Sequence, residues 1–160
     1  MTRFSELLKL LTEGNVDFII IGGLAAVVHG SVQSTQDVDV VYSRTPGNIQ
    51  RLAAALGPVN AYLRGAPPGL PFRADAPTFT AGLNFTLTTD LGWLDLLGEV
   101  AGGGRYEALT SHSVEVEVFG VRCRAIDLPT LIATKLAAGR PKDIQAVAEL
   151  RALLQRGTNR

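Results

Sequence analysis

The stretch FIIIGGLAAVVHGSVQSTQDVDVV, residues 18–41, decides how this chain is expected to fold. Its apolar, β-branched beginning, which extends back to Val16, is typical of a buried strand, and Gly22-Gly23 ends that strand. The residues LAAVVH that follow predict a short helix, and DVDVVY (37–42) predicts a second strand. Glycines let a backbone approach a ligand closely, and a helix N-terminus favours anions. This turn is therefore a candidate phosphate-binding site.

Two carboxylates, Asp37 and Asp39, occupy alternate positions of the second predicted strand. Side chains two residues apart on a strand share a face, so both carboxylates point the same way with Cα atoms roughly 6–7 Å apart. Two such anions repel each other unless a cation or solvent screens them. Mg²⁺ prefers oxygen ligands and keeps substrate phosphates in its coordination shell, so this pair predicts a magnesium site.

A third carboxylate, Asp95, lies inside the apolar run WLDLL, which is an unfavourable place for an unpaired charge. On a strand beside Asp37 and Asp39, it would complete a set of three metal ligands and could accept the proton of an attacking hydroxyl. Two metal ions bridged by such acids stabilise both the attacking and the leaving oxygen of a phosphoryl displacement. The three aspartates are therefore the candidate catalytic and metal-binding residues.

The rest of the chain predicts an α/β (α+β) fold, a mixed β-sheet flanked by helices with further helices at the C-terminal end. Residues 114–126 predict a hairpin that turns at Phe119-Gly120 and pairs Glu117 with Arg122 and Glu115 with Arg124. No repeat or linker is evident, so residues 1–160 are expected to form a single domain. Further strands are expected over 83–88 and 92–100, helices over 4–11, 46–56, 128–138 and 141–154, and a loop over 66–77.

Composition excludes several classes of protein. A hydrophobic fraction of 46% excludes a disordered chain, and a single cysteine, Cys123, excludes an internal disulfide and a cysteine-based zinc site. No apolar run approaches the ~20 residues of a membrane span, and residues 1–11 do not resemble a signal peptide, so a cytoplasmic protein without membrane attachment is expected. The 15 basic residues are balanced by 15 acidic ones, which argues against nucleic-acid binding through bulk charge alone. The turn also lacks the G-x-G-x-x-G pattern of dinucleotide-binding proteins.

The order and spacing of these features resemble a known superfamily. Gly22-Gly23, thirteen intervening residues, then Asp37-Val38-Asp39, with Asp95 later between leucines, look like the DNA polymerase β-like nucleotidyltransferase fold. Within that superfamily the chain is similar to small bacterial nucleotidyltransferases, including abortive-infection and toxin–antitoxin members. The resemblance is most specific over residues 16–42 and extends to 83–100 and 127–150.

The resemblance implies an enzyme that transfers a nucleoside monophosphate from a nucleoside triphosphate, such as ATP, to a hydroxyl of an RNA or protein acceptor. It implies that Gly22 and Gly23 hold the triphosphate. It further implies that Asp37, Asp39 and Asp95 bind Mg²⁺, as two ions, with Mn²⁺ as the alternative ion. Among the toxin-like members a cognate antitoxin protein is a common partner, so the resemblance adds an antitoxin to the candidate partners of this chain.

The segment from residue 128 to Asp143 resembles a helix–turn–Lys-Asp segment in which a lysine of these relatives reaches the nucleotide phosphates. Lys135 and Lys142 are the candidates, with Arg140 between them, and the alternative is that both lysines are solvated helix residues. The chain departs from the relatives at Gly23, where a serine is frequent, so one side-chain contact to phosphate would be missing.

Several alternatives stay open on sequence grounds. The fold without catalysis, a silent module that binds a protein partner or a nucleotide, is the second functional hypothesis, and it predicts no need for the three carboxylates. His29 is interpreted as a packing or capping residue at a helix end. The loop over 66–77 is either a lid that recognises the acceptor or a plain surface loop.

Overall fold

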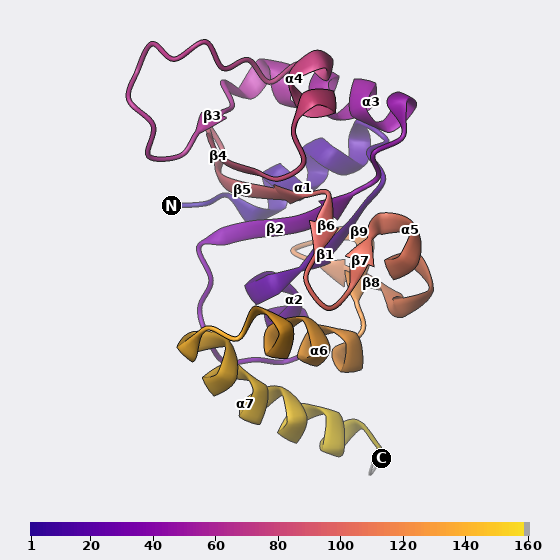
Figure 1. The fold of residues 1–160 in the computed structure, drawn as a ribbon. Helices are drawn as coiled ribbons and strands as arrows, with labels where there is room; N and C mark the ends of the chain where they lie inside the picture. Colours follow the sequence, from indigo (N-terminus) through magenta and orange to yellow (C-terminus); the bar gives the residue numbers. More distant parts are fainter. Residues whose placement is uncertain (159–160) are drawn as a thin grey trace.

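A seven-stranded mixed sheet forms the centre of the computed structural model, which describes residues 1–158 (Figure 1). The strand order is β3-β4-β5-β2-β1-β9-β8, and a separate two-stranded ribbon pairs β6 with β7. The strands are β1 (Phe18–Ile21), β2 (Asp37–Tyr42), β3 (Tyr62–Leu63), β4 (Phe85–Thr89), β5 (Gly92–Leu97), β6 (Glu99–Val100), β7 (Gly104–Arg105), β8 (Ser113–Val118) and β9 (Val121–Ile126). The predicted mixed sheet is thus confirmed.

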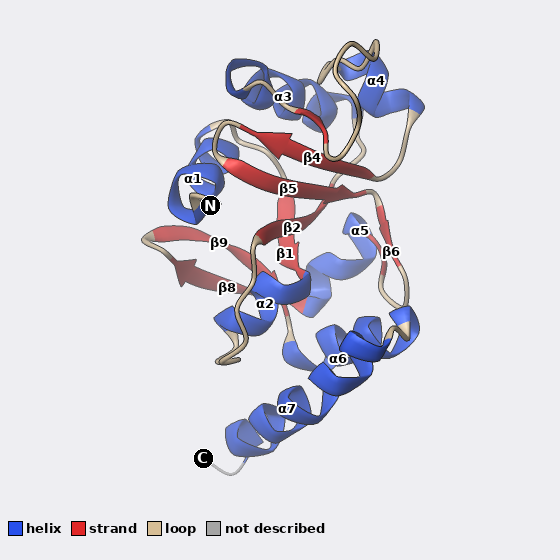
Figure 2. Ribbon diagram, turned by 90° about the vertical axis from the view of Figure 1, so that its left-hand side faces the viewer, coloured by secondary structure: helices blue, strands red, loops and turns tan. Residues whose placement is uncertain are grey.

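Helices lie on both sides of this sheet. Figure 2 shows α3 and α4 together on one side of the molecule and α6 and α7 on the opposite side, with the strands between them. The helices are α1 (Phe4–Glu13), α2 (Gly22–Val28), α3 (Pro46–Leu56), α4 (Ala76–Ala81), α5 (Tyr106–Leu109), α6 (Leu128–Ala138) and α7 (Pro141–Thr158), with short 3₁₀ turns at Gly57–Val59 and Thr110–His112. Within residues 1–158, none of the helices has the length and apolar character needed to cross a bilayer.

Strand β2 sets the geometry of the sheet's centre, because it pairs antiparallel with β1 and parallel with β5. In this register Asp39 lies opposite Asp95, and Asp37 lies opposite Trp93. Alternation along the strands therefore places these four side chains on one face of the sheet. The alternate residues of the same two strands face the other way and are buried in the core: Val38, Val40, Leu94 and Leu96.

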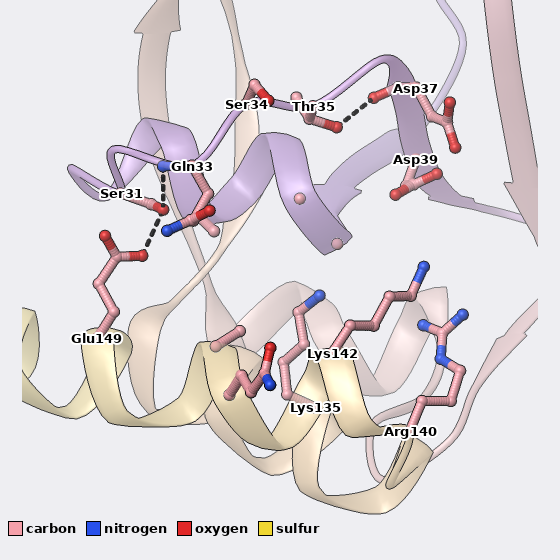
Figure 3. A pocket seen from close by; sticks show the side chains of 15 residues that line it. Ser31, Gln33, Ser34, Thr35, Asp37, Asp39, Lys135, Arg140, Lys142 and Glu149 are labelled. Carbon is pink, nitrogen blue, oxygen red and sulfur yellow. Dashed lines mark hydrogen bonds between the residues drawn. The ribbon is translucent and has the colours of Figure 1, made fainter.

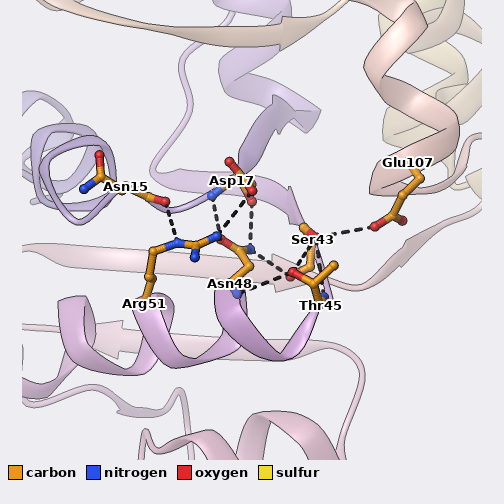
Figure 4. A network of polar contacts seen from close by, with 7 residues as sticks. All are labelled: Asn15, Asp17, Ser43, Thr45, Asn48, Arg51 and Glu107. Carbon is orange, nitrogen blue, oxygen red and sulfur yellow. Dashed lines mark hydrogen bonds and ion pairs between the residues drawn. The ribbon is translucent and has the colours of Figure 1, made fainter.

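A buried asparagine fixes the far ends of β1 and β2 to helix α3 (Figure 4). The Asn48 side chain accepts a hydrogen bond from the Asp17 backbone N–H at 2.7 Å and donates to the carbonyl oxygens of Asp17 and Ser43 at 3.1 and 2.7 Å. Asn48 is fully buried, and these bonds satisfy polar groups that burial would otherwise leave unpaired. The two strands that carry the glycine turn and the paired aspartates are therefore held in a fixed relation.

The predicted hairpin is confirmed in its register but not in its ion pairs. Glu117 faces Arg122 and Glu115 faces Arg124, as expected. The ion pair that forms is instead the diagonal one between Arg122 and Glu115, at 3.9 Å. Arg124 donates instead to the Ser113 hydroxyl at 2.8 Å and to the Ser113 carbonyl at 2.9 Å, and exposed ion pairs contribute little that would favour the facing carboxylate over these acceptors.

Three predicted boundaries are wrong for local reasons. The strand expected over 92–100 ends at Leu97, because the Gly98 N–H turns to the Leu83 carbonyl and the Asn84 side chain. The loop expected over 66–77 stops at Asp75, whose carboxylate caps α4 by accepting from the Thr78 N–H at 2.9 Å. The helix expected to begin after the glycine pair already includes both glycines.

Candidate functional site

The three predicted carboxylates meet on the open face of the sheet. Asp37 and Asp39 come from β2 and Asp95 from the neighbouring strand β5. One oxygen of each carboxylate lies within 4.8 Å of the others, and all three side chains are partly buried. Placing three acids this close, partly out of water, creates a concentration of negative charge that needs a cation or a proton.

That charge shifts the pKa of Asp39. Burial, followed by the negative charge of Asp95, a hydrogen bond with it and the charge of Asp37, raises the pKa of the Asp39 carboxyl to about 7, and Lys135 opposes this rise. Asp39 therefore holds a proton through the weakly acidic range when no metal is bound. A divalent cation can replace this proton, and three carboxylates are the oxygen donors that Mg²⁺ prefers. The residues present fit a divalent metal ion.

Gly22 is required by the way Asp39 packs. It is the first residue of α2, directly after β1, and its φ of +65° is in the left-handed region that glycine adopts without strain. A side chain here would collide with the Asp39 carboxylate. The glycine turn predicted for phosphate binding thus has a second role, since it leaves room for a carboxylate against the backbone.

Replacing Gly22 with alanine tests this packing. We expect Gly22→Ala to lower the free energy of unfolding by about 1–3 kcal/mol, through both the left-handed backbone and the displaced carboxylate. Metal-dependent stabilisation should fall with it, because Asp39 can no longer keep its position. Thermal unfolding with and without Mg²⁺ measures both effects. The matched variant Gly57→Ala, at a position with open space and ordinary φ, should behave like the wild type. Equal metal responses in the two variants would contradict the assignment.

A pocket of about 410 Å³ lies beside the carboxylates and brings the remaining predicted residues together. Gly22 and Gly23 line it from α2, and Lys135 and Lys142 line it from α6 and α7, with Arg140 from the turn between these helices. Figure 3 shows the cationic side chains reaching from the two C-terminal helices toward β2 and the start of α2. One wall of the pocket is therefore positively charged and the opposite wall carries the aspartates.

A buried carboxylate that the sequence analysis had not singled out organises the cationic wall. The Asp143 side chain is completely buried and accepts from the Arg140 Nε at 2.6 Å and from the Arg140 backbone N–H at 3.2 Å. Its other oxygen lies 3.6 Å from Lys135 Nζ. Although burial opposes its ionisation, the Arg140 hydrogen bonds and the charges of Arg140 and Lys135 hold the pKa of Asp143 below its ordinary value.

The loop between α2 and β2 is fixed to helix α7. The Glu149 carboxylate accepts from the Ser31 hydroxyl at 2.5 Å and from the Val32 N–H at 3.1 Å. The same loop brings Thr35 against Gly23, where a Cβ would lie only 2.9 Å from the Thr35 hydroxyl oxygen. Position 23 has no side-chain hydroxyl, as the sequence analysis noted, but Thr35 lines the pocket beside it and offers a hydroxyl there.

Arg64 is a further residue of the site that the sequence analysis did not predict. It follows the two-residue strand β3, yet its Nη2 donates to Asp95 Oδ1 at 2.8 Å and its Nη1 lies 3.7 Å from Asp37 Oδ2. The cluster therefore contains its own cation.

His29 lies at the end of α2, where its Nε2 is 2.7 Å from the Ile126 carbonyl oxygen, a position that agrees with the interpretation of His29 as a packing or capping residue. Cys123 packs against the core, and burial raises the pKa of its thiol to about 11.

Comparison with solved structures finds similar proteins at low sequence identity. A candidate nucleotidyltransferase from Thermotoga maritima superposes with a TM-score of 0.57 at 16% identity, over 98% of this chain and 96% of that one. The lincosamide antibiotic adenylyltransferase LnuA, with lincomycin bound, gives a TM-score of 0.60 at 13% identity, over 94% and 96%. The antibiotic-resistance factor ANT(2'')-Ia gives 0.53 at 14%, over 98% and 91%. No protein-family model and no curated protein matches the sequence.

Proposed function

We propose that this chain, which has the nucleotidyltransferase fold, is a metal-dependent enzyme that transfers a nucleoside monophosphate from a nucleoside triphosphate to a hydroxyl group. One observation carries the proposal: three carboxylates with oxygens within 4.8 Å of one another line a pocket that Lys135, Arg140 and Lys142 also line. Acids that can bind a metal and cations that can bind phosphate are the two parts that phosphoryl transfer needs on either side of a triphosphate.

Each group has a role in this reaction. Gly22 and Gly23 let the backbone approach the triphosphate, and Lys135 and Lys142 neutralise its charge. Asp37, Asp39 and Asp95 would hold a divalent metal ion, which would supply charge neutralisation at the phosphate oxygens. The acceptor oxygen attacks the α-phosphorus, the bond to the β-phosphate oxygen breaks, and pyrophosphate leaves. Asp95 takes the proton of the acceptor hydroxyl.

Three classes of hydroxyl compound are candidates for the acceptor. The sequence resemblance implies RNA ends or protein side chains. The likeness to an adenylyltransferase with bound lincomycin adds small hydroxylated molecules to these acceptors. An antitoxin protein, as the resemblance implies, stays a prediction.

Incubation with labelled nucleoside triphosphates, Mg²⁺ and each acceptor class in turn tests the activity directly. In parallel, we expect Mg²⁺ with a non-hydrolysable triphosphate to raise the melting temperature of the wild type, because a ligand that binds only the native state stabilises it by mass action. At a ligand concentration of 100 times Kd this gain is about 2.7 kcal/mol. Asp37→Asn should abolish the gain, whereas Glu117→Gln, an exposed acid on β8, should retain it.

The silent-module alternative has one observation in its favour, which is that Arg64 already pairs with Asp37 and Asp95. A module of this kind would bind a nucleotide without Mg²⁺ and label no acceptor. The enzyme proposal is lost if no acceptor becomes labelled and Asp37→Asn binds nucleotide as tightly as the wild type does with Mg²⁺.

A further inference from the structure

Arg64 occupies the carboxylate cluster from the edge of the sheet. Its backbone N–H donates to the Thr86 carbonyl at 2.9 Å, which fixes the start of the side chain beside β4. From there Nη2 reaches Asp95 Oδ1 at 2.8 Å and the Leu87 carbonyl at 2.7 Å, and Nη1 approaches Asp37 Oδ2 to 3.7 Å. Lys135, the cation that faces Asp39 from α6, forms its ion pair with Asp143. The positive charge paired with this cluster therefore comes from Arg64.

The guanidinium is held from its other side by an aromatic ring. Its Cζ lies 4.6 Å from the centre of the Trp93 ring, within the range of a cation–π interaction. Trp93 stands in register with Asp37 on the neighbouring strand, so the ring and the carboxylates share one face of the sheet. Trp93 is the only tryptophan of the chain. Any movement of Arg64 therefore takes place against a unique fluorescent side chain.

The position of Arg64 is electrostatically favourable but incompletely satisfied. Its Nε is buried and has no hydrogen-bond partner among the described residues. A buried donor without a partner costs free energy, and the charge of the aspartates offsets this cost together with the contacts to the Leu87 carbonyl and the Trp93 ring. A second cation that neutralises the aspartates removes the contribution of their charge.

We propose that Arg64 is a resident counter-cation that competes with the divalent metal for Asp37 and Asp95, so that metal binding displaces the guanidinium from the Asp95 carboxylate. The part of the inference that concerns Asp95 as a proton acceptor rests on the proposed function. Two cations that need the same oxygens bind in competition, and each weakens the other by the same factor.

This competition has a functional consequence. While Arg64 donates to Oδ1 of Asp95, that oxygen is not available to a metal or to the proton of an acceptor hydroxyl. The site is therefore neutralised and inactive at low metal concentration and becomes competent when the metal takes over the charge. Only a side chain has to move, since the backbone of Arg64 is fixed to β4 and the next residue, Gly65, begins a segment without helix or strand through residue 75.

Titration of the nucleotide-free protein with Mg²⁺, and separately with Mn²⁺, tests the proposal without any need for activity. In the wild type we expect Trp93 emission to change and saturate at the metal concentration at which calorimetry shows saturation. Arg64→Gln, which keeps donors but removes the charge, should bind Mg²⁺ about tenfold more tightly and lose the emission change. Arg73→Gln removes an exposed arginine of the same segment and should behave like the wild type.

Circular dichroism of the metal-free variants establishes that they fold. Arg64→Lys is the second variant, because it keeps the charge but not the planar fork, and its metal affinity should lie between those of the wild type and Arg64→Gln. The proposal is overturned if Arg64→Gln binds Mg²⁺ no more tightly than the wild type, or if calorimetry detects metal in the wild type while Trp93 emission stays constant. If competition is seen but no acceptor is ever labelled, the proposed function fails and the role of Arg64 stands.

Discussion

Replacing Asp39 with asparagine should make the metal-free protein more stable at alkaline pH while abolishing its response to metal. Burial and the charges of Asp95 and Asp37 raise the pKa of Asp39 to about 7 in the folded state, against 3.8 for an ordinary aspartate. The folded state therefore holds a proton that the unfolded chain has released, and the resulting stability is fully present below about pH 4 and lost as the pH rises through 7. Asparagine carries no charge to bury, so the free energy of unfolding of the variant should not fall as the pH rises through 7.

The expected gain for Asp39→Asn over the wild type at pH 8 is about 2 kcal/mol, after allowance for the partial exposure of the side chain, and it should shrink toward pH 4. Transfer activity should fall by about 10³-fold, because loss of a metal ligand removes several kcal/mol of charge stabilisation. Urea denaturation with a chelator across this pH range measures the first effect. Glu117→Gln is the control, since that acid is exposed. A stability difference that does not vary with pH would contradict the raised pKa of Asp39.

This behaviour follows from a cluster that was only partly predictable from the sequence. The shared face of Asp37 and Asp39 follows from strand alternation, because only the local backbone decides it. The position of Asp95 opposite Asp39 depends on strand order and register, which no local pattern sets. The apolar run around Asp95 nevertheless indicated that this carboxylate must be paired with a positive charge, and on that ground the sequence analysis selected Asp95 as the third carboxylate of the site.

Arg64 could not be predicted from the sequence, because its contacts also depend on strand order and register. It follows a strand of two residues at the edge of the sheet, where there is no periodicity to detect. Its partner Asp95 lies 31 residues further along the chain. Helix α4 was different, because the signal was present: Asp75 followed by Pro77 is typical of a helix start, but the prolines around it favoured a loop. A contact between residues far apart in the chain depends on the tertiary fold, whereas a helix cap such as Asp75 is set by neighbouring residues and is visible in the sequence.

The distribution of charge also gains meaning from the fold. The chain is neutral overall, but the structure places acids and bases on facing walls of one pocket: Asp37 and Asp39 on β2, and Lys135, Arg140 and Lys142 on the C-terminal helices. Under the proposed function, a triphosphate between these walls would contact the cations directly and the acids only through a metal. A neutral chain can in this way bind a highly charged substrate locally, without a broad basic surface.

Replacing Asp143 with asparagine should produce the largest loss of stability of any single polar substitution considered for this site. The carboxylate is completely buried and is shared by Arg140 and Lys135, so its loss leaves two cations without their partner. Breaking a buried ion pair by removing one member costs about 3–5 kcal/mol. Because the Arg140 side chain is partly exposed and can be solvated when its partner is lost, we expect a loss of about 3 kcal/mol. Asp127→Asn is the matched control, because Asp127 caps α6 and asparagine caps equally well.

The pH dependence of this loss has the opposite sign to that of Asp39. Despite burial, Arg140 and Lys135 hold the pKa of Asp143 below 3.8, so its contribution is present above that pH and is lost as the pH falls through the folded-state pKa. The difference between wild type and Asp143→Asn should therefore be full at pH 7 and shrink in acid. Urea denaturation of both proteins at pH 7 and in acid measures this difference. A difference that does not change with pH would show that the charge of Asp143 is not what stabilises the turn.

The same substitution should also weaken nucleotide binding. Asp143 holds Arg140 and Lys135 at the wall that faces the aspartates, and without it both cations must be ordered when the triphosphate arrives. Ordering a long side chain costs about 0.5–1.5 kcal/mol, so we expect the dissociation constant for a triphosphate with Mg²⁺ to rise by about tenfold. Calorimetry at a temperature where the variant is fully folded separates this effect from the loss of stability. Unchanged affinity in the folded variant would mean that Asp143 stabilises the α6–α7 turn without positioning Arg140 and Lys135 for nucleotide binding.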